Sequence, residues 1–377
     1  MALQMANSQP TDVPAADVAV LFDRRRLRVA RELRGLSQVQ LAREIGGIRA
    51  ASLSQFEQGH AKPSSATLQR LAVALRVPLA FFAAPARPDV VGATNGFFRS
   101  LRSAPPRDRQ RALAHVELAR EVARELERFV RLPDVDLPRT QGELSVQATR
   151  EEIERAAANV RTQWQVPPGP IDDMVLLLER HGIVTTRLNV GHTEIDAFSV
   201  PFADRPVVVL GADKNLRDRS RFDAAHELAH LVLHREDQAG NKVIEAQANQ
   251  FAAAFLMPAD EIRGQLPAKA DWPTLLRLKA HWHVSIGALL RRAFTLDVMD
   301  ERIYVQALKV MSAKGWRKHE PGNLGSPERP LLLRRAVDVA SGIGVPLALL
   351  AQQAGLPDEE VRMIVGVEPD ERPAVEL

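Results

Sequence analysis

The sequence predicts a multidomain, mainly α-helical protein that carries one small β-sheet. Its 377 residues are enough for two or three domains at about 100–200 residues each. Apolar residues recur at helical spacing near both ends of the chain, whereas two short β-branched runs, Ile183–Thr186 and Val207–Leu210, lie in the middle. We therefore expect an all-α head, a central α+β domain and a helical C-terminal domain.

Changes in composition suggest where these parts begin and end. Residues 1–19 are small and polar without periodicity, which is typical of a disordered tail. A helix over about residues 107–131 has Glu and Arg at i,i+3 and i,i+4 spacing, and we expect a solvated connecting helix. The expected segments are the tail (1–19), the head (20–85), a linker with the connecting helix (86–148), the central domain (149–298) and the C-terminal domain (299–377).

The composition excludes several kinds of chemistry. With no cysteine, the chain cannot form a disulfide, a thiolate nucleophile, an iron–sulfur cluster or a Cys-ligated zinc site. Any bound metal must therefore be held by His and carboxylate side chains. No apolar run approaches the roughly 20 residues that cross a bilayer, and no targeting pattern precedes the head. We expect a cytoplasmic protein with no membrane partner.

Charge is distributed unevenly along the chain. The formal net charge is +3, but residues 20–85 contain 11 Arg or Lys against 4 Asp or Glu, a balance of +7. The rest of the chain then carries −4, since 3 − 7 = −4. A basic head on a mildly acidic body favours nucleic-acid binding by the head.

The head has the spacing of a helix-turn-helix motif. Ser37 can cap a helix that runs through Glu44, and Gly46-Gly47 can form the turn. A second helix is expected over Ala50–Gln58, stopped by Gly59. The turn holds one residue more than the usual pattern, which leaves open by one residue where the second helix begins.

These residues resemble the Cro/C1-type (XRE) helix-turn-helix family. The resemblance is carried by Leu33, Leu36-Ser37-Gln38, Leu41-Ala42, Leu53-Ser54, Phe56-Glu57 and Gly59. It implies a transcriptional regulator that binds a double-stranded DNA operator, as a homodimer. In that family the second helix enters the major groove. The resemblance places Arg49, Ala50, Ser52, Ser54 and Gln55 against the bases and Gln38 on a phosphate.

The strongest chemical signal is His226-Glu227-Leu228-Ala229-His230. Two His at i and i+4 lie on one helix face and can bind one Zn²⁺, and Glu227 then lies beside the open coordination position as general base. A third ligand is required. Glu245 is the first candidate. Ala248, Asn249 and Ala252 share its face of a predicted helix, so this helix can pack closely beside the helix that carries the two His. Asn249 can then hydrogen-bond one of the metal ligands. His234 and Glu236 are the alternatives.

The central domain resembles the ImmA/IrrE family of gluzincin-type metallopeptidases. The matching pieces are Pro206–Leu210, Arg221-Phe222-Asp223, His226–Leu231, Glu245 through Asn249–Ala252 to Leu256-Met257-Pro258, and Trp282 to Ala293. The resemblance implies a zincin-like domain with zinc, or alternatively manganese, on His226, His230 and Glu245. It also implies that Glu227 is the catalytic acid/base. Members of that family typically cleave an XRE-type repressor, often after DNA damage, which makes single-stranded DNA a candidate signal.

Two functions follow from this pair of resemblances. The first is a DNA-binding regulator whose zinc endopeptidase domain relieves repression by cutting itself or a partner repressor in a stress response. The alternative is a repressor whose peptidase-like domain is a non-proteolytic sensor or scaffold. Near the C-terminus, Ala351, Gly355 and Val361 again have helix-turn-helix spacing, but the acidic run Asp358-Glu359-Glu360 would repel phosphate. We expect that segment to serve packing or partner contact.

Overall fold

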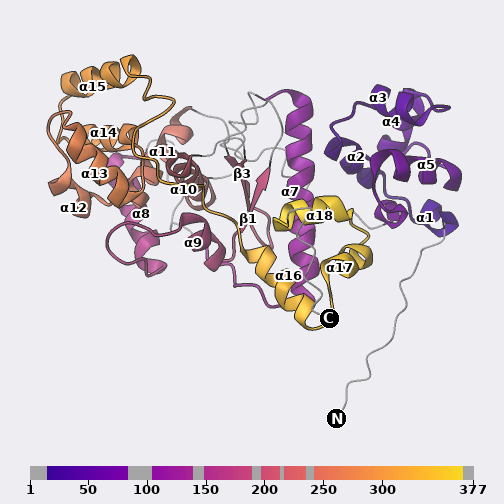
Figure 1. The fold of residues 1–377 in the computed structure, drawn as a ribbon. Helices are drawn as coiled ribbons and strands as arrows, with labels where there is room; N and C mark the ends of the chain where they lie inside the picture. Colours follow the sequence, from indigo (N-terminus) through magenta and orange to yellow (C-terminus); the bar gives the residue numbers. More distant parts are fainter. Residues whose placement is uncertain are drawn as a thin grey trace, which may run out of the picture. The chain divides into compact units, whose positions relative to one another are not determined.

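The computed structural model describes residues 15–83, 104–138, 148–188, 197–212, 216–234 and 242–367. The chain divides into two compact units. Unit 1 combines residues 1–91, 104–132 and 331–377, and unit 2 combines residues 92–103 and 133–330. Each unit therefore contains segments that are far apart in the sequence (Figure 1). In the described part of the chain, no helix has the length and apolar character needed to cross a membrane.

The head of unit 1 is a bundle of short helices. Its helix-turn-helix consists of two helices that contact each other, and Ser37 caps the first of them through a capping box with Gln40. The buried side chains of Leu27, Leu41, Leu53 and Leu68 form its centre. The elements are α1 (Ala15–Leu21), α2 (Arg24–Leu33), α3 (Gln38–Ile45), α4 (Ala50–Gln58), α5 (Ser65–Leu75) and the 3-10 helix η1 (Leu79–Ala83).

Helix α1 corrects the expected extent of the disordered tail. The expectation covered residues 1–19, but α1 begins at Ala15 and contacts α5 and η1. Val18 is fully buried in these contacts, which explains why so short a segment is helical. Residues 1–14 lie outside the described residues.

The expected solvated connecting helix is also corrected. Helix α7 (Pro106–Glu127) contacts α2 and the C-terminal helices α16 (Leu332–Gly342), α17 (Leu347–Ala354) and α18 (Asp358–Val365). It buries ten side chains, among them Val116, Leu118 and Val122. The charged positions take part in this packing too, since Arg120 is buried and Glu121 pairs with Arg26 of α2 (2.7 Å).

The C-terminal region does not form one domain from residue 299 onward. Helix α15 (Glu301–Ala313) contacts α14 (Ile286–Thr295), and its Ala307 and Met311 belong to the core of unit 2. Helices α16 to α18 instead belong to unit 1. There Glu360, at the start of α18, is buried in an ion pair with Arg34 of α2. The acidic start of α18 thus serves packing within unit 1.

Unit 2 contains a three-stranded sheet. The strands β1 (Val184–Leu188), β2 (Ala197–Val200) and β3 (Val207–Gly211) are arranged in the order β1-β3-β2. β1 runs parallel to β3, with Val184 opposite Val207, and β2 runs antiparallel to β3, with Ser199 opposite Val208. The sequence indicated β1 and β3 but not β2, which has only four residues.

Helix α10 (Arg217–Leu233) contacts the sheet at β2 and β3 and also contacts α11 (Lys242–Leu256) and α9 (Met174–Arg180). Helix α11 packs in turn on α8 (Arg150–Gln163). Helices α12 (Ala259–Ile262), α13 (Trp272–Trp282) and α14 extend the same apolar core. The short 3-10 helix η5 (Arg263–Gln265) follows α12 and buries no residue. This arrangement places α10 at the centre of unit 2.

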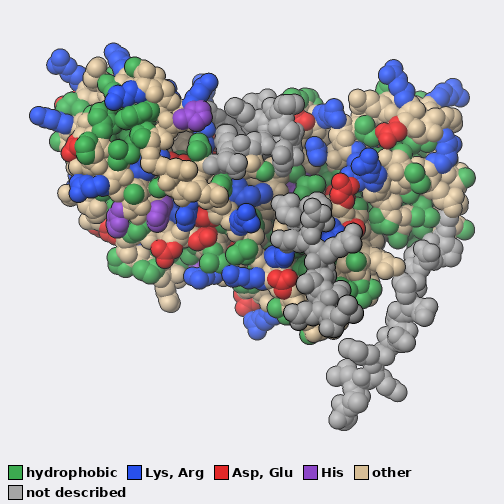
Figure 2. Space-filling model, viewed as in Figure 1, with side chains coloured by type: hydrophobic (Ala, Val, Ile, Leu, Met, Phe, Trp, Pro, Cys, Tyr) green, Lys and Arg blue, Asp and Glu red, His purple; other side chains and the backbone are tan. Residues whose placement is uncertain are grey.

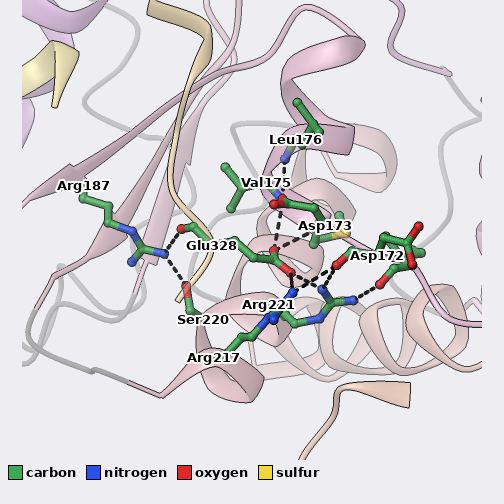
Figure 3. A network of polar contacts seen from close by, with 11 residues as sticks. Asp172, Asp173, Val175, Leu176, Arg187, Arg217, Ser220, Arg221 and Glu328 are labelled. Atoms are coloured by element: carbon green, nitrogen blue, oxygen red, sulfur yellow. Dashed lines mark hydrogen bonds and ion pairs between the residues drawn. The ribbon is translucent and has the colours of Figure 1, made fainter. Parts of the chain in front are cut away.

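A buried ionic network fixes the N-terminal half of α10 (Figure 3). Arg221 of α10 is completely buried and pairs with the carboxylate of Glu328, which comes from the segment after α15. The second carboxylate oxygen of Glu328 accepts hydrogen bonds from the backbone N–H groups of Met174 (2.8 Å) and Val175 (3.2 Å), at the start of α9. Glu328 therefore joins α9 to α10 and satisfies helix-end donors that would otherwise be unpaired.

We predict that Glu328→Gln lowers the free energy of unfolding of unit 2 by about 3–5 kcal/mol, because Arg221 is left as an uncompensated buried charge. Chemical denaturation followed by tryptophan fluorescence measures the change. The matched control is Arg329→Gln, since Arg329 is the exposed neighbour of Glu328. Equal stability of the two variants would contradict the role given to Glu328.

Candidate metal centre and DNA-binding helix

Helix α10 presents His226 and His230 on one face. Their spacing of four residues stacks the two imidazoles on successive turns, and their Nε2 atoms lie 3.0 Å apart. Ala224, Ala225 and Ala229 are fully buried on the same helix, so neighbouring elements can approach it closely. His230 is 2% exposed, and the site therefore lies inside unit 2.

Glu245 of α11 completes a group of three. Its Oε2 lies 3.3 Å from His226 Nε2, and its Oε1 lies 3.9 Å from His230 Nε2. Among the described residues, these three side chains form the group whose candidate ligand atoms all lie within 4.8 Å of one another. Tetrahedral zinc with bonds of about 2.0–2.1 Å needs ligand atoms about 3.3 Å apart, so the spacing fits a metal ion.

Hydrogen bonds on the outer side of both imidazoles determine which ring nitrogen faces the group. Asn249 Oδ1 lies 3.1 Å from His226 Nδ1 and can only accept, so Nδ1 carries a proton, and in the neutral ring Nε2 keeps its lone pair. His234 lies between Gln247 and His230. The Nε2 atom of His234 is 3.2 Å from Gln247 Oε1, and its Nδ1 atom is 3.0 Å from Nδ1 of His230. Since Gln247 Oε1 accepts, a neutral His234 accepts from His230 Nδ1–H.

Both Nε2 lone pairs therefore point inward, beside a carboxylate. Three electron-rich atoms at this spacing repel one another unless a cation or a proton lies among them. This arrangement fits a bound metal ion and argues against His234 as the third ligand, because His234 contacts the outer nitrogen of His230. The other alternative ligand, Glu236, lies outside the described residues.

Glu227 follows His226 on α10 and is 4% exposed. Ser199 of β2 donates a hydrogen bond of 2.7 Å to its Oε2. Burial raises the pKa of Glu227 to about 7, against the lowering effects of His226 and of the Ser199 hydrogen bond. A carboxyl group with a pKa near neutrality can both accept and return a proton at neutral pH. The contact with Ser199 was not predicted, because β2 was not predicted.

The two ligand-candidate imidazoles differ electrostatically. Burial lowers the pKa of His226, but the hydrogen bond to Glu245 and the nearby Glu227, Glu245 and Asp223 charges outweigh it, so the pKa is raised. A proton on Nε2 then lies between His226 and Glu245, in the position that a metal ion would take. Burial, together with the two neighbouring His, lowers the pKa of His230 well below its ordinary value. His230 is therefore neutral at pH 7, as a metal ligand must be.

In unit 1, the turn of the helix-turn-helix is built by two glycines. Gly46 and Gly47 both have positive φ, 65° and 61°, a conformation that glycine adopts without strain. The longer turn leaves α4 beginning at Ala50, with Arg49 as its N-cap residue. Figure 2 shows Lys and Arg side chains at several places on the visible face of this head.

The predicted base-contacting residues all lie at the start or on the accessible sides of α4. Arg49 and Gln55 are exposed, and Ala50, Ser52 and Ser54 are half-buried. Gln38, predicted on a phosphate, donates a hydrogen bond to Glu57 Oε2 at 2.9 Å, and its contact with DNA stays a prediction. Glu57 is buried and also accepts from Arg31 Nε (2.6 Å) and Nη2 (2.9 Å). Gln38 thus supports the ion pair between α2 and α4 in this structure, which its sequence position did not reveal.

Two family models match the chain. Residues 27–82 match the helix-turn-helix model of XRE type, and residues 178–294 match the IrrE N-terminal-like domain of the M78 peptidases. The chain fuses an XRE-type helix-turn-helix domain to an IrrE/ImmA-like peptidase domain. No curated protein matches it.

The matched regions coincide with the two sites. Helices α3 and α4 lie inside the first match, and His226, Glu227, His230 and Glu245 lie inside the second. The fusion protein is accordingly a DNA-binding regulator with a domain of a metallopeptidase family. A metal ion is implied by that family, and the His/His/Glu group is the candidate site for it.

We predict that Glu245→Ala reduces bound zinc from about one equivalent to a small fraction in the purified chain, because two imidazoles alone leave the metal weakly held. Metal analysis after dialysis measures the stoichiometry. Glu301→Ala is the control, since Glu301 is an exposed acid at the start of α15. Full retention of zinc by the Glu245 variant would place the third ligand elsewhere.

For the head, we predict that Arg49→Ala and Gln55→Ala each weaken operator binding by about 1–3 kcal/mol while changing binding to random DNA less, as expected for base contacts. Titration of both DNAs at fixed salt concentration measures the difference. Gln69→Ala, an exposed position on α5, is the control. An equal loss on both DNAs would make these residues phosphate contacts.

Proposed function

We propose that this protein is a transcriptional regulator whose zinc-dependent endopeptidase domain relieves repression by cleaving itself or a partner XRE-type repressor. The observation that carries the proposal is the inward orientation of the two Nε2 lone pairs and the Glu245 carboxylate, with the buried Glu227 beside them. A scaffold domain has no need of a buried general base beside such a group.

In this proposal, His226, His230 and Glu245 hold the metal, with zinc favoured and manganese the alternative. A bound zinc ion would polarise the scissile carbonyl group and acidify the attacking water. Asn249 and His234 keep both imidazoles in the tautomer that leaves Nε2 free. These side chains are held in place by the fold, so little reorganisation is needed on binding.

Glu227 performs the proton transfers in this proposal. Ser199 holds one of its carboxylate oxygens, which orients the other toward the attacking water. Glu227 removes a proton from that water and then delivers it to the leaving amine. Its pKa of about 7 suits both steps near neutral pH. One group with this pKa can therefore serve as both the base and the acid of peptide-bond hydrolysis.

The helix-turn-helix head would bring this activity to an operator. Arg49, Ala50, Ser52, Ser54 and Gln55 of the head are proposed to read the major groove, with the protein acting as a homodimer. Single-stranded DNA formed by damage is the proposed signal for cleavage. Loss of the cleaved repressor would then raise transcription.

The test compares the wild-type chain with Glu227→Gln in the presence of zinc or manganese, with and without single-stranded DNA. Substrates are the chain itself and co-expressed XRE-type repressors. We expect cleavage by the wild type and a loss of about 10²–10⁴-fold in the variant, as is usual when a general base is removed. Mass spectrometry of the products locates the cut.

Glu301→Gln is the matched control, because it removes an exposed acid outside the site. Retained zinc in the Glu227 variant shows that the metal site survives the substitution. If no protein is cut under any condition while operator binding persists, the peptidase proposal is wrong and the domain is a non-proteolytic sensor or scaffold.

A further inference from the structure

Unit 2 contains a cavity of about 860 Å³ on the side of α10 and α11 where Asn249 lies. Its walls come from the beginning of α10, one face of α11, α13 and α14, and from residues 316–324 in the segment after α15. We call residues 316–324 the strap. No strand of the described chain contributes to the walls.

Positive charge dominates the walls of this cavity. Eight Arg or Lys side chains line it against three Asp or Glu. Four of these cations are held in ion pairs, such as Lys279 with Asp218 (2.8 Å) and Arg292 with Glu154. The other four are Arg219, Arg291, Arg317 and Lys318; all are exposed and have no ion pair with another described residue.

The cavity already accommodates one anionic group of the chain itself. The carboxylate of Glu320, in the strap, accepts hydrogen bonds from the backbone N–H groups of Ile286 (2.7 Å) and Gly287 (3.0 Å) at the start of α14. Lys279 Nζ lies 2.8 Å from the same carboxylate. One wall is therefore an anion-binding arrangement. Arg291 lies over the rings of Phe294 and Tyr304 (5.4 and 5.8 Å from the centroids), so Arg219, Arg317 and Lys318 provide the further capacity that Glu320 does not use.

The organic part of a ligand would find apolar surface here. Phe222 and Trp316 are half-buried lining residues, and Ala253 and Ala288 add small apolar surfaces. An extended peptide would lack a strand edge on which to form backbone hydrogen bonds. The volume lies within the range of about 300–1,000 Å³ that is usual for small-molecule sites.

We propose that this cavity binds a phosphorylated small molecule with a flat organic group, a nucleotide being the simplest example. Arg219, Arg317 and Lys318 bind the phosphates, since guanidinium groups form paired hydrogen bonds to phosphate oxygens. The site is distinct from the three candidate metal ligands, although Asn249 belongs to its wall and also hydrogen-bonds His226. The proposal does not depend on peptidase activity.

Isothermal titration calorimetry of the zinc-loaded full chain with ATP, in excess magnesium, tests this assignment. We expect saturable binding that weakens about tenfold or more when Arg219→Ala and Arg317→Ala are combined, because each removes a charge-assisted hydrogen bond. The matched control combines Arg277→Ala and Arg302→Ala, two exposed Arg residues of unit 2 that do not line the cavity. The control pair should keep the wild-type affinity.

Two further probes define the ligand class. A short oligothymidylate that binds with the same dependence on Arg219 and Arg317 would support the site and assign its phosphate to a nucleic-acid strand. Hexaglutamate binding in place of ATP would overturn the proposal in favour of an acidic peptide. It is also overturned if neither phosphorylated probe binds at millimolar concentration, or if the control pair weakens binding as much as the cavity pair.

Discussion

The candidate metal centre requires helices α10 and α11 to pack closely enough for a carboxylate on one to reach two imidazoles on the other. Small side chains provide this approach, since Ala225 and Ala229 on α10 and Ala248 and Ala252 on α11 are all buried. Larger side chains at these buried positions would overpack the core, at a cost of about 1–3 kcal/mol each. The placement of Glu245 beside the two imidazoles therefore rests on close packing in the core around α10 and α11.

Helix α10 carries two groups of buried polar side chains, and they have different effects. At its N-terminal half, Glu328 neutralises Arg221 and ties α10 to α9. On the face that carries the candidate metal ligands, Asn249 and His234 orient the two imidazoles and Gln247 holds His234. A cation would relieve the repulsion between the ring nitrogens and the Glu245 carboxylate. The network around Glu328 stabilises the fold, whereas the hydrogen bonds around the two imidazoles hold their ring nitrogens in an orientation that favours binding of a cation.

Much of both sites could be predicted from local sequence spacing. The i,i+4 histidines specify one helix face, Glu245 with its small neighbours specifies the facing helix, and Ala50–Gln58 gives the second helix of the helix-turn-helix. Local spacing cannot reveal a partner that depends on tertiary packing. Ser199 lies on a strand of four residues, and Glu328 lies 107 residues from Arg221, so neither contact has a periodic signal.

The same limit explains the errors about domain organisation. The charge pairs of α7 were correctly placed on a helix, but its alanine-rich face gave a weak signal of burial, and its partners α16 to α18 come more than 200 residues later. The contact that Gln38 makes inside the head was missed for the same reason. In the structure its amide reaches Glu57, which only the folded head brings near.

The central claim is that His226, His230 and Glu245 bind one metal ion together. A crystal structure of the zinc-loaded chain, with anomalous data collected at the zinc edge, measures this most directly. We expect one strong anomalous peak within bonding distance of both Nε2 atoms and of a Glu245 carboxylate oxygen, about 2.0–2.2 Å. A peak coordinated by other side chains, or none at this site in a zinc-saturated crystal, would contradict it.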